Sequence, residues 1–317
     1  MSKKILLSGV KPTGRPHIGN YFGAMKQFVD LQNAHKDAEK FFMIANYHGL
    51  NFIQNAEEMR QNTLDLALDY LAIGIDPEQS SIFKQSDVSA HTELAWIFDT
   101  ITTMPYLMRA HAFKDAEAKD KEISVGTFNY PMLMAADILL YDTDIVPVGA
   151  DQKQHIEYAR DTAQKFNNTF GETFKLPEAL IMKEVAVVPG TDGRKMSKSY
   201  GNTIPLFATR EDIIKGVMSI VTDSSGEVPM NVYNMHKLLR SEEELKKIYD
   251  ENKGKYKILK EALIEDLDIF IKPLRERRAE IAKDITKVEE ILEDGAIKAK
   301  EVADEKLFAI KTAVGVI

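Results

Sequence analysis

The sequence predicts an α/β protein in which a parallel sheet with crossover helices is followed by an all-helical region. Two observations lead to this fold class. In the first 205 residues, short apolar runs of strand length alternate with segments of helical periodicity, the pattern of parallel strands joined by helices. After Pro205 the strand-like runs nearly vanish, and helical periodicity with charged faces dominates from Glu211 to Lys311.

The elements of the first part can be assigned in order. A short apolar strand is followed by a loop rich in Gly and Pro, and then by a helical pattern with apolar residues at Phe22, Met25, Phe28, Val29 and Leu31. The predicted helices are Asn20–His35 and Ala56–Gly74. The predicted strands are Lys4–Ser8, Phe41–Ala45, Ser81–Phe83, Ile145–Val148 and Ala186–Val188.

The second part, residues 206–317, is predicted to form a separate helical domain. Pro273 and Gly295 are expected to interrupt its helices. The charge runs at Glu242–Glu244 and Arg275–Arg278 are typical of solvated helix faces. The pattern leaves two arrangements open for the last helix: it packs within this domain, or it packs back on the first domain.

Composition excludes several classes of protein. The 317 residues are 44% apolar and 28% charged, an ordinary globular composition with room for about two domains. Cysteine is absent, which excludes disulfide scaffolds, zinc–thiolate sites, iron–sulfur clusters and cysteine nucleophiles. No segment resembles a signal peptide or a membrane span, so we expect a soluble cytoplasmic protein. The net charge of -8 argues against non-specific coating of nucleic acid but allows a local basic patch.

The loop after the first strand is the most informative short segment. Its glycines Gly9 and Gly14 are spaced as in a P-loop, but Arg15 and Pro16 follow where that motif needs Lys and Ser or Thr. What remains is HIGN, His17 to Asn20, at the start of a helix, where unpaired N–H groups favour an anion. The alternative is that Asn20 only caps the helix and His17 is an exposed loop residue.

A second polar loop, Gly190–Ser199, lies between the two parts of the chain and contains KMSKS. Arg194, Lys195 and Lys198 lie close together in it. Two lysines on such a loop suit a pyrophosphate group that is held and then released. The alternative is a solvated basic linker.

The two motifs together resemble the signature pair of class I aminoacyl-tRNA synthetases. The segment from Tyr130 to Asp161, YPMLMAADILLYDTDIVPVGADQKQHIEYARD, and the opening SGVKPTGRPHIGNYFGA closely resemble the tryptophanyl-tRNA synthetases. The resemblance is dense from Lys4 to Ser199 and looser beyond, where it includes VTDS at Val221–Ser224.

The resemblance implies a Rossmann-like catalytic domain over residues 1–205 and a helical anticodon-binding domain over residues 206–317. It implies activation of L-tryptophan by ATP to tryptophanyl-adenylate and pyrophosphate, then transfer of tryptophan to tRNA(Trp). ATP with Mg²⁺ would be the substrate complex, with no tightly bound cofactor, no metal site on the protein and no membrane partner. A homodimer is also implied.

The family's nucleotide contacts transfer to positions that match its motifs. The resemblance implies that His17 lies beside the α-phosphate and that Lys198 reaches the phosphates, and Lys11 stands where relatives often have Gln. Gly149 and Asp151 match adenosine and ribose contacts. A phosphate-binding lysine on the loop before Tyr130 is expected but not chosen among Lys114, Lys119 and Lys121. The remaining ATP contacts implied by the resemblance are Gly19, Asn20, Lys195, Met196 and Ser197.

The amino-acid pocket centres on Asp137, a lone carboxylate in an apolar run. A buried carboxylate needs a donor; an arginine or a backbone N–H elsewhere is one source, and the ligand is another. The indole N–H only donates, so a carboxylate complements it. Leu7 replaces an aromatic residue of some relatives. The tryptophan-binding residues implied by the resemblance are Leu7, His48, Tyr130, Met134, Asp137, Val146, Val148 and Gln152.

Three alternatives remain at this point. A tyrosyl-tRNA synthetase shares the fold and the chemistry, but a phenol needs more polar partners than one carboxylate in an apolar setting. A small-molecule adenylyl or cytidylyl transferase does not need the helical second part. A non-catalytic paralogue does not need His17, Asn20, Lys195 and Lys198.

Overall fold

The core of the molecule is a five-stranded sheet in which all strands run parallel, in the order β3-β2-β1-β4-β5. The computed structural model describes residues 3–110, 113–114, 122–148, 153–181, 187–222 and 226–317. The strands are β1 Ile5–Val10, β2 Glu39–Ile44, β3 Ser81–Lys84, β4 Ile145–Val148 and β5 Glu178–Ile181.

The sheet confirms the predicted fold class and the first four predicted strands. The fifth prediction, Ala186–Val188, is wrong because the fifth strand is β5. Ala186 lies outside the described residues. Val188 is buried in a loop, where its carbonyl oxygen accepts the N–H of Met196 at 2.9 Å. Its apolar character therefore serves packing beneath the KMSKS loop and not a strand.

Helices cover both faces of the sheet, and side chains alternate between two hydrophobic cores. In β2, Phe42 packs into one core and Phe41 into the other, as the two-residue period of a strand requires. The helices and helical turns of the first part are α1 Ile18–Asn20, the π-helical turn η1 Tyr21–Met25, α2 Lys26–Ala34, α3 Asn46–Gly49, α4 Ala56–Ile73, η2 Gln85–Asp87, α5 Ala90–Ile101, α6 Met104–Leu107, α8 Val125–Leu139, α9 Lys153–Phe170 and η4 Lys198–Tyr200.

The two helices predicted in the first part are present. The first begins slightly earlier than predicted, at Ile18, and contains a π-helical turn that the sequence pattern did not indicate. The second, α4, begins after the N-cap Asn55 and ends at Gly74, whose φ of 107° is in the left-handed region.

The second part of the chain is helical throughout its regular structure. Its helices are α10 Arg210–Met218, α11 Met230–His236, α12 Glu242–Glu251, α13 Tyr256–Ile281 and α14 Ile285–Ala313. The expected interruptions are wrong, because Pro273 and Gly295 both lie inside continuous helices. The division of the chain into domains at residue 206 stays a prediction.

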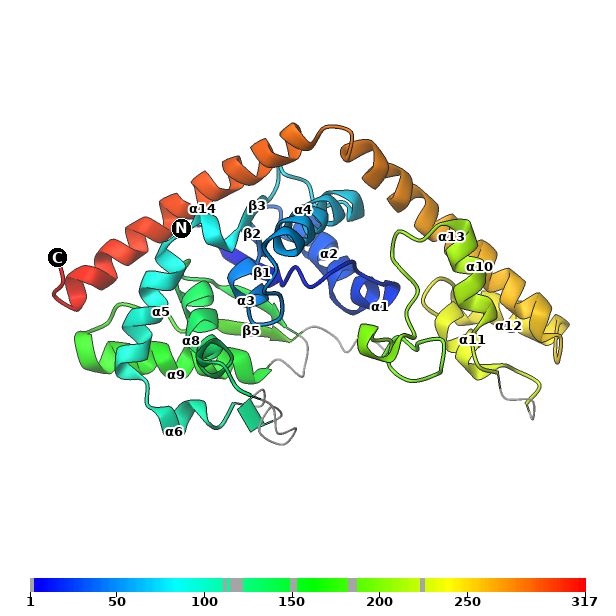
Figure 1. Cartoon of the computed structure of the whole chain (residues 1–317), viewed down its shortest axis with the longest axis horizontal. Coiled ribbons are helices and arrows are strands. Elements are labelled where there is room, and N and C mark those ends of the chain that lie inside the picture. The colour runs from blue at the N-terminus through cyan, green and yellow to red at the C-terminus, as the bar shows by residue number, and fades with distance from the viewer. Residues whose placement is uncertain (1–2, 111–112, 115–121, 149–152, 182–186, 223–225) are drawn as a thin grey trace.

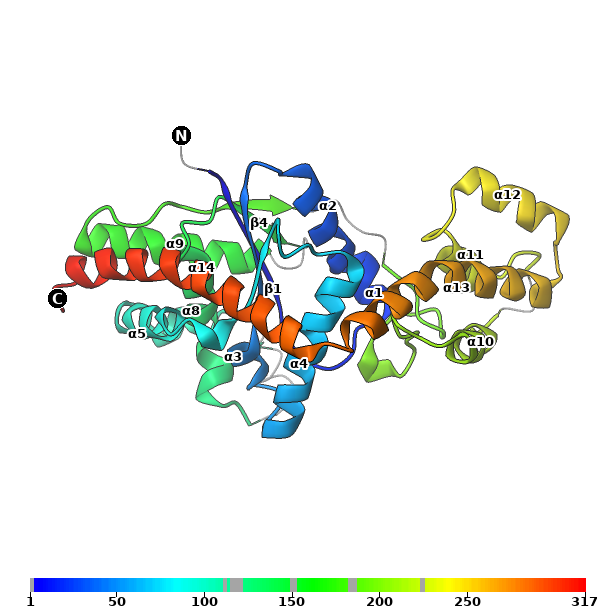
Figure 2. The same ribbon diagram turned by 90° about the horizontal axis from the view of Figure 1, so that it is seen from above.

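Helices α13 and α14 form an arch above the sheet, with α14 returning over β3 (Figure 1). Seen from above, α14 runs away from the group formed by α10 to α13 (Figure 2). The face of α14 toward the sheet carries small residues, among them the buried Gly295, Ala299 and Ala303. At Gly295 the backbones approach so closely that an added Cβ would lie 2.0 Å from the carbonyl oxygen of Ile82 in β3. Glycine is therefore required there by contact with the sheet.

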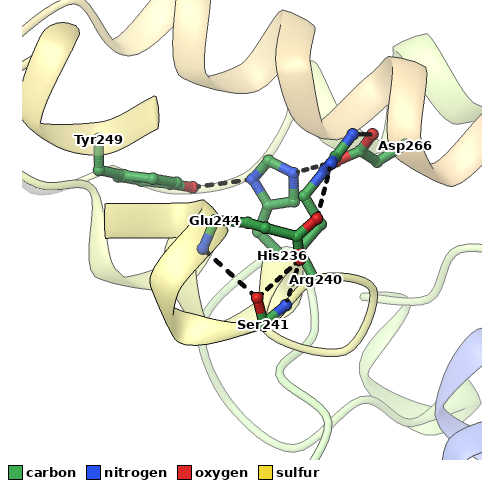
Figure 3. A network of polar contacts seen from close by, with 6 residues as sticks. All are labelled: His236, Arg240, Ser241, Glu244, Tyr249 and Asp266. Atoms are coloured by element: carbon green, nitrogen blue, oxygen red, sulfur yellow. Dashed lines mark hydrogen bonds and ion pairs between the residues drawn. The ribbon is translucent and has the colours of Figure 1, made fainter. Parts of the chain in front are cut away.

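A buried polar network holds α11, α12 and α13 together (Figure 3). The His236 Nε2 lies 2.6 Å from Asp266 Oδ2, and its Nδ1 lies 3.3 Å from the hydroxyl of Tyr249. Arg240 Nη2 donates to Asp266 Oδ1 at 2.6 Å. Burial lowers the pKa of His236, so the neutral ring donates to Asp266 and accepts from Tyr249.

Within the described ranges, every helix is either too short or too polar to cross a membrane.

Gly295→Ala should destabilise the protein, although this change normally stabilises a helix interior by about 0.5–1 kcal/mol. The new methyl group would push α14 away from Ile82, and overpacking of this kind costs about 1–3 kcal/mol. Urea denaturation followed by circular dichroism measures the change. Lys298→Ala, an exposed change in the same helix, is the matched control and should stay within about 0.5 kcal/mol of wild type. A Gly295→Ala protein as stable as wild type would contradict this account.

Candidate active site

A cavity of about 360 Å³ opens between the carboxyl ends of β1 and β4. The chain leaves these neighbouring strands in opposite directions, to β2 and β3 on one side and to β5 on the other. Such a switch point leaves a crevice in which α/β proteins bind ligands. The predicted residues that line this cavity are Leu7, Lys11, His48, Tyr130, Met134, Asp137 and Val146.

The polar centre of the cavity is the carboxylate of Asp137, which is only 4% exposed. His48 Nε2 lies 2.8 Å from its Oδ2, and both His91 Nδ1 and Gln85 Nε2 lie 2.7 Å from its Oδ1. Burial alone would raise the pKa of Asp137, but the hydrogen bonds from His48 and His91 outweigh it and lower the pKa to about 2. Asp137 is therefore ionised at neutral pH.

These donors replace the arginine or backbone N–H that the sequence analysis considered. An ionised carboxylate offers about four acceptor positions. Oδ1 accepts two hydrogen bonds and Oδ2 accepts one, so Oδ2 retains a position for one more donor. The network continues from His91 Nε2 to the hydroxyl of Tyr141 at 2.9 Å. The ionised carboxylate of Asp137 can only accept, so Nδ1 of His91 donates to it.

Sequence reasoning missed Gln85 and His91. They lie 52 and 46 residues from Asp137, and no local pattern connects them to it. Gln85 directly follows β3, and the carboxyl ends of parallel strands meet at one edge of a sheet. That position was the one available signal. The side chain of Gln85 also accepts the N–H of Tyr47 at 3.1 Å, beside His48.

Apolar side chains surround this carboxylate. Leu7 from β1, Val146 from β4 and Met134 from α8 line the cavity. The ring of Tyr130 lies 6.5 Å from that of His48, and burial raises the pKa of its phenol, which stays protonated. The result is a largely apolar chamber around the carboxylate of Asp137, with the amine of Lys11 at its edge.

Part of the predicted site lies outside the described residues. This holds for Gly149, Asp151 and Gln152, for the side chain of Val148, and for Lys119 and Lys121. Lys114 is described and is exposed. The assignments of these residues stay predictions.

His17 caps the helix that follows the first loop. Its Nδ1 accepts the N–H of Asn20 at 3.2 Å, and Asn20 Oδ1 accepts the N–H of His17 at 3.0 Å. His17 is only 7% exposed, so the alternative of an exposed loop residue beside an Asn20 cap is wrong. Burial, and then the charge of Lys198, lower the pKa of His17 to about 4. The ring is neutral at pH 7, and because Nδ1 accepts, Nε2 carries the proton and can donate to an anion.

The two sequence motifs lie against each other. The side-chain amine of Lys198 donates to the carbonyl oxygen of Thr13 at 3.0 Å. Met196 is buried against Gly19, where an added Cβ would lie 3.2 Å from Met196 Cβ and 2.8 Å from His17 Nδ1. Gly19 is therefore needed for this contact between the loops.

The KMSKS loop has an internal frame built on Asn202, which is 2% exposed. Asn202 Oδ1 accepts the N–H of Ser197 at 2.8 Å, and its Nδ2 donates to Asp192 at 2.6 Å and to the carbonyl oxygen of Lys195 at 3.2 Å. The side chain of Lys195 is exposed. This is a structured loop that presents two lysines, and the alternative of a simple solvated linker is wrong.

Lys11 connects the first loop to the cavity. Its amine lies 4.5 Å from the centre of the Phe52 ring, and desolvation lowers its pKa. The charge that distinguishes this position from the usual Gln of the family is thus placed at the edge of the cavity.

Comparison with known proteins agrees with this geometry. The profile of a family described as tRNA synthetases class I (W and Y) matches residues 2–269. The tryptophan–tRNA ligase of Fusobacterium nucleatum is 47% identical over 320 residues, which cover 98% of each chain. The crystal structure of tryptophanyl-tRNA synthetase from Campylobacter jejuni, complexed with ADP and tryptophan, matches with a TM-score of 0.91 and 45% identity over 98% of this chain and 99% of that one.

A more distant structure shares the fold alone. The tyrosyl-tRNA synthetase of Archaeoglobus fulgidus, solved with L-tyrosine, matches with a TM-score of 0.67 at 20% identity, over 87% of this chain and 90% of that one. The family profile and the high-identity relatives cover nearly the whole chain. The chain therefore belongs to the class I tRNA synthetases, as a member of the tryptophanyl-tRNA synthetase family.

Proposed function

We propose that this chain activates L-tryptophan with ATP and then transfers it to tRNA(Trp). The observation that carries the choice of amino acid is the remaining acceptor position on Asp137 Oδ2, inside an apolar chamber. An indole supplies one N–H donor and a large apolar surface, and it has no acceptor that needs a partner. The relatives that are tryptophan–tRNA ligases support the same choice.

In the first step a carboxylate oxygen of tryptophan attacks the α-phosphorus of ATP. The bond from that phosphorus to the bridging oxygen breaks, and pyrophosphate leaves. A carboxylate is already a competent nucleophile, so positioning and charge stabilisation provide the catalysis. In the second step a ribose hydroxyl of the tRNA attacks the acyl carbon, and AMP leaves.

The nucleotide site in this proposal is formed by the two loops. His17 Nε2–H donates to a phosphoryl oxygen, and Gly19 allows close approach to the backbone. Lys195 and Lys198 neutralise the leaving pyrophosphate. Mg²⁺ arrives with ATP. Asn20, Met196, Ser197, Gly149 and Asp151 keep their predicted roles at ATP, and Gln152 its role at the ammonium group. The Campylobacter relative with bound ADP and tryptophan supports this arrangement.

Residues 206–317 contain the proposed anticodon-binding domain. Its helices α10 to α13 extend from the catalytic sheet (Figure 1), which suits contact with a long RNA. A cytoplasmic location also stays a prediction.

A homodimer is proposed as well, and exposed apolar side chains on neighbouring helices support it. Trp96 on α5 is 70% exposed, Met104 on α6 is 67% exposed, and Val125 on α8 is 80% exposed. A second copy of the chain would remove these side chains from water.

Trp96→Glu should shift the protein from dimer to monomer in sedimentation velocity. A wild-type monomer at micromolar concentration would contradict the dimer.

The test of the proposed function is ATP–pyrophosphate exchange with tryptophan, with tyrosine and with no amino acid. Exchange should depend on tryptophan. Dependence on tyrosine would support the alternative of a tyrosyl-tRNA synthetase. Exchange with neither would contradict both.

Lys195→Ala and Lys198→Ala should each slow adenylate formation strongly while leaving the KM for tryptophan unchanged. The lysines face charge that develops as pyrophosphate leaves, and removal of one such donor typically lowers kcat by about 10²–10³. Pre-steady-state adenylate formation measures the effect. Lys215→Ala, an exposed lysine on α10, is the matched control. Normal rates in both loop variants would show that these lysines do not act on pyrophosphate.

Asp137→Ala should lower kcat/KM for tryptophan by about tenfold to a hundredfold, because the indole N–H would be left unpaired. Asp137→Asn should also reduce it, because the amide loses the negative charge and its NH2 group would face a donor, either His48 or the pair of His91 and Gln85. Both variants should discriminate less against phenylalanine, with the KM for ATP unchanged. Exchange kinetics with the three aromatic amino acids provide the measurement.

Asp142→Asn is the control for Asp137. It is the same substitution just beyond α8, where Asp142 pairs with Lys306 outside the cavity. If the Asp137 variants only lose stability and keep the tryptophan preference of wild type, Asp137 is a paired core carboxylate and selectivity lies elsewhere.

A further inference from the structure

Two carboxylates on α4 connect segments from both parts of the chain. Asp65 and Asp69 lie one turn apart, and Asp69 is 0% exposed. Burial raises the pKa of Asp69 to about 6, although Arg15 and Arg278 oppose the rise. Asp69 therefore needs positive charge beside it in order to remain ionised.

Arg278 supplies that charge from α13. Its Nε donates to Asp69 Oδ1 at 2.5 Å, and its Nη2 donates to Asp65 Oδ1. Only 14% of its side chain is exposed. This bidentate contact lies where α13 packs against α4 (Figure 2), so Arg278 joins the helical part of the chain to the catalytic sheet.

Arg15, from the loop that precedes HIGN, faces the same carboxylates but does not close on them. Its guanidinium nitrogens lie 3.6 Å from Asp65 and 3.6 Å from Asp69, beyond a good hydrogen bond. Its side chain is 45% exposed. The ring of Phe207 lies 5.6 Å from the guanidinium carbons of both Arg15 and Arg278. The two arginines thus share one aromatic ring and one carboxylate pair.

The charge of Asp69 also acts on Lys198 of the KMSKS loop. The negative charge of Asp69 raises the pKa of Lys198, against the larger effect of desolvation, which lowers it. Lys198 contacts the same first loop through Thr13. Arg15 therefore faces carboxylates that Arg278 already occupies, and the charge of Asp69 also acts on Lys198.

We propose that Arg278 is a positioning residue for the nucleotide: by occupying Asp65 and Asp69, it leaves Arg15 and Lys198 free to meet the phosphates of ATP. Without Arg278, the two carboxylates would draw Arg15 into direct hydrogen bonds and would attract Lys198. The loop of residues 11–19 would move toward α4. Arg15 and Lys198 would then no longer be available to bind the phosphates of ATP. This inference depends on the nucleotide role of the loops in the proposed function.

The test is Arg278→Gln, which removes the positive charge. The amide nitrogen of glutamine takes the place of the arginine Nε, although the side chain is shorter. The KM for ATP in pyrophosphate exchange should rise about three- to thirtyfold, which lies within the range of coupling between contacting residues, and the KM for tryptophan should stay within about twofold. Arg277→Gln removes the same charge from the exposed neighbour on α13 and should change neither KM. Equal changes in both KM values for Arg278→Gln would indicate a general structural role and overturn the proposal.

A second variant distinguishes charge balance from simple support. Asp65→Asn combined with Arg278→Gln removes the excess negative charge without restoring the contact between α13 and α4. The double variant should recover most of the ATP affinity, whereas a purely structural role predicts a further loss. If Arg278→Gln does not fold, Arg278→Met takes its place, because it removes the charge and keeps a flexible unbranched side chain in the contact with α4. An unchanged KM for ATP in that folded variant would overturn the proposal.

ATP affinity measured by calorimetry on the same proteins keeps this inference separate from the proposed function. A wild-type chain that shows no exchange would contradict the proposed function. A wild-type chain and an Arg278→Gln variant with equal ATP affinity would contradict the role of Arg278, whatever reaction the enzyme catalyses.

Discussion

The reversal of strand order between β1 and β4 is the constraint on which the site depends. Because the chain leaves these adjacent strands in opposite directions, no crossover helix closes their carboxyl ends, and a cavity remains there. The segments proposed to bind tryptophan and ATP are arranged around that cavity. β1 leads directly into the first loop, and α8 carries Asp137. The KMSKS loop contacts the first loop through Lys198 and Thr13.

Two buried carboxylates show how the fold uses charge inside this frame. Asp137 has three donors from separate elements, and its pKa falls to about 2. Asp69 is equally buried, but its pKa rises to about 6, and its Oδ2 has no hydrogen-bond partner among the described residues. Three hydrogen bonds make the first a fixed anion, and the remaining acceptor position on its Oδ2 can orient a ligand. Incomplete compensation makes the second depend on arginines from distant segments, which suits a connection between parts of the chain.

Local patterns explain how much of this could be predicted. β1 to β4, α4 and the two motif loops were readable because apolar runs, a glycine cap and short charged loops are local signals. Gln85 and His91 were not readable, because their meeting with Asp137 depends on which strands neighbour each other. Gly295 was misread as a break for a similar reason. A glycine is needed there because the backbone of Ile82 in β3 leaves no room for a side chain. Only the three-dimensional arrangement reveals this contact. The fifth strand was placed at Ala186–Val188 instead of at β5 because that segment is apolar. The structure shows that Val188 is apolar because it packs in a loop.

The same long-range contacts bear on whether the helical part acts independently. Both hydrophobic cores contain residues from beyond position 206. Leu263 and Leu267 of α13 join the core that contains Phe42, whereas Ala299 and Ala303 of α14 join the core that contains Phe41. Removing the helices would therefore expose both faces of the sheet and free Arg278 from α4. The helical part also meets the first loop at α4, because Arg278 and Arg15 face the same two carboxylates. The ion pairs at α4 are therefore the place where α13 and the first loop meet at one pair of carboxylates.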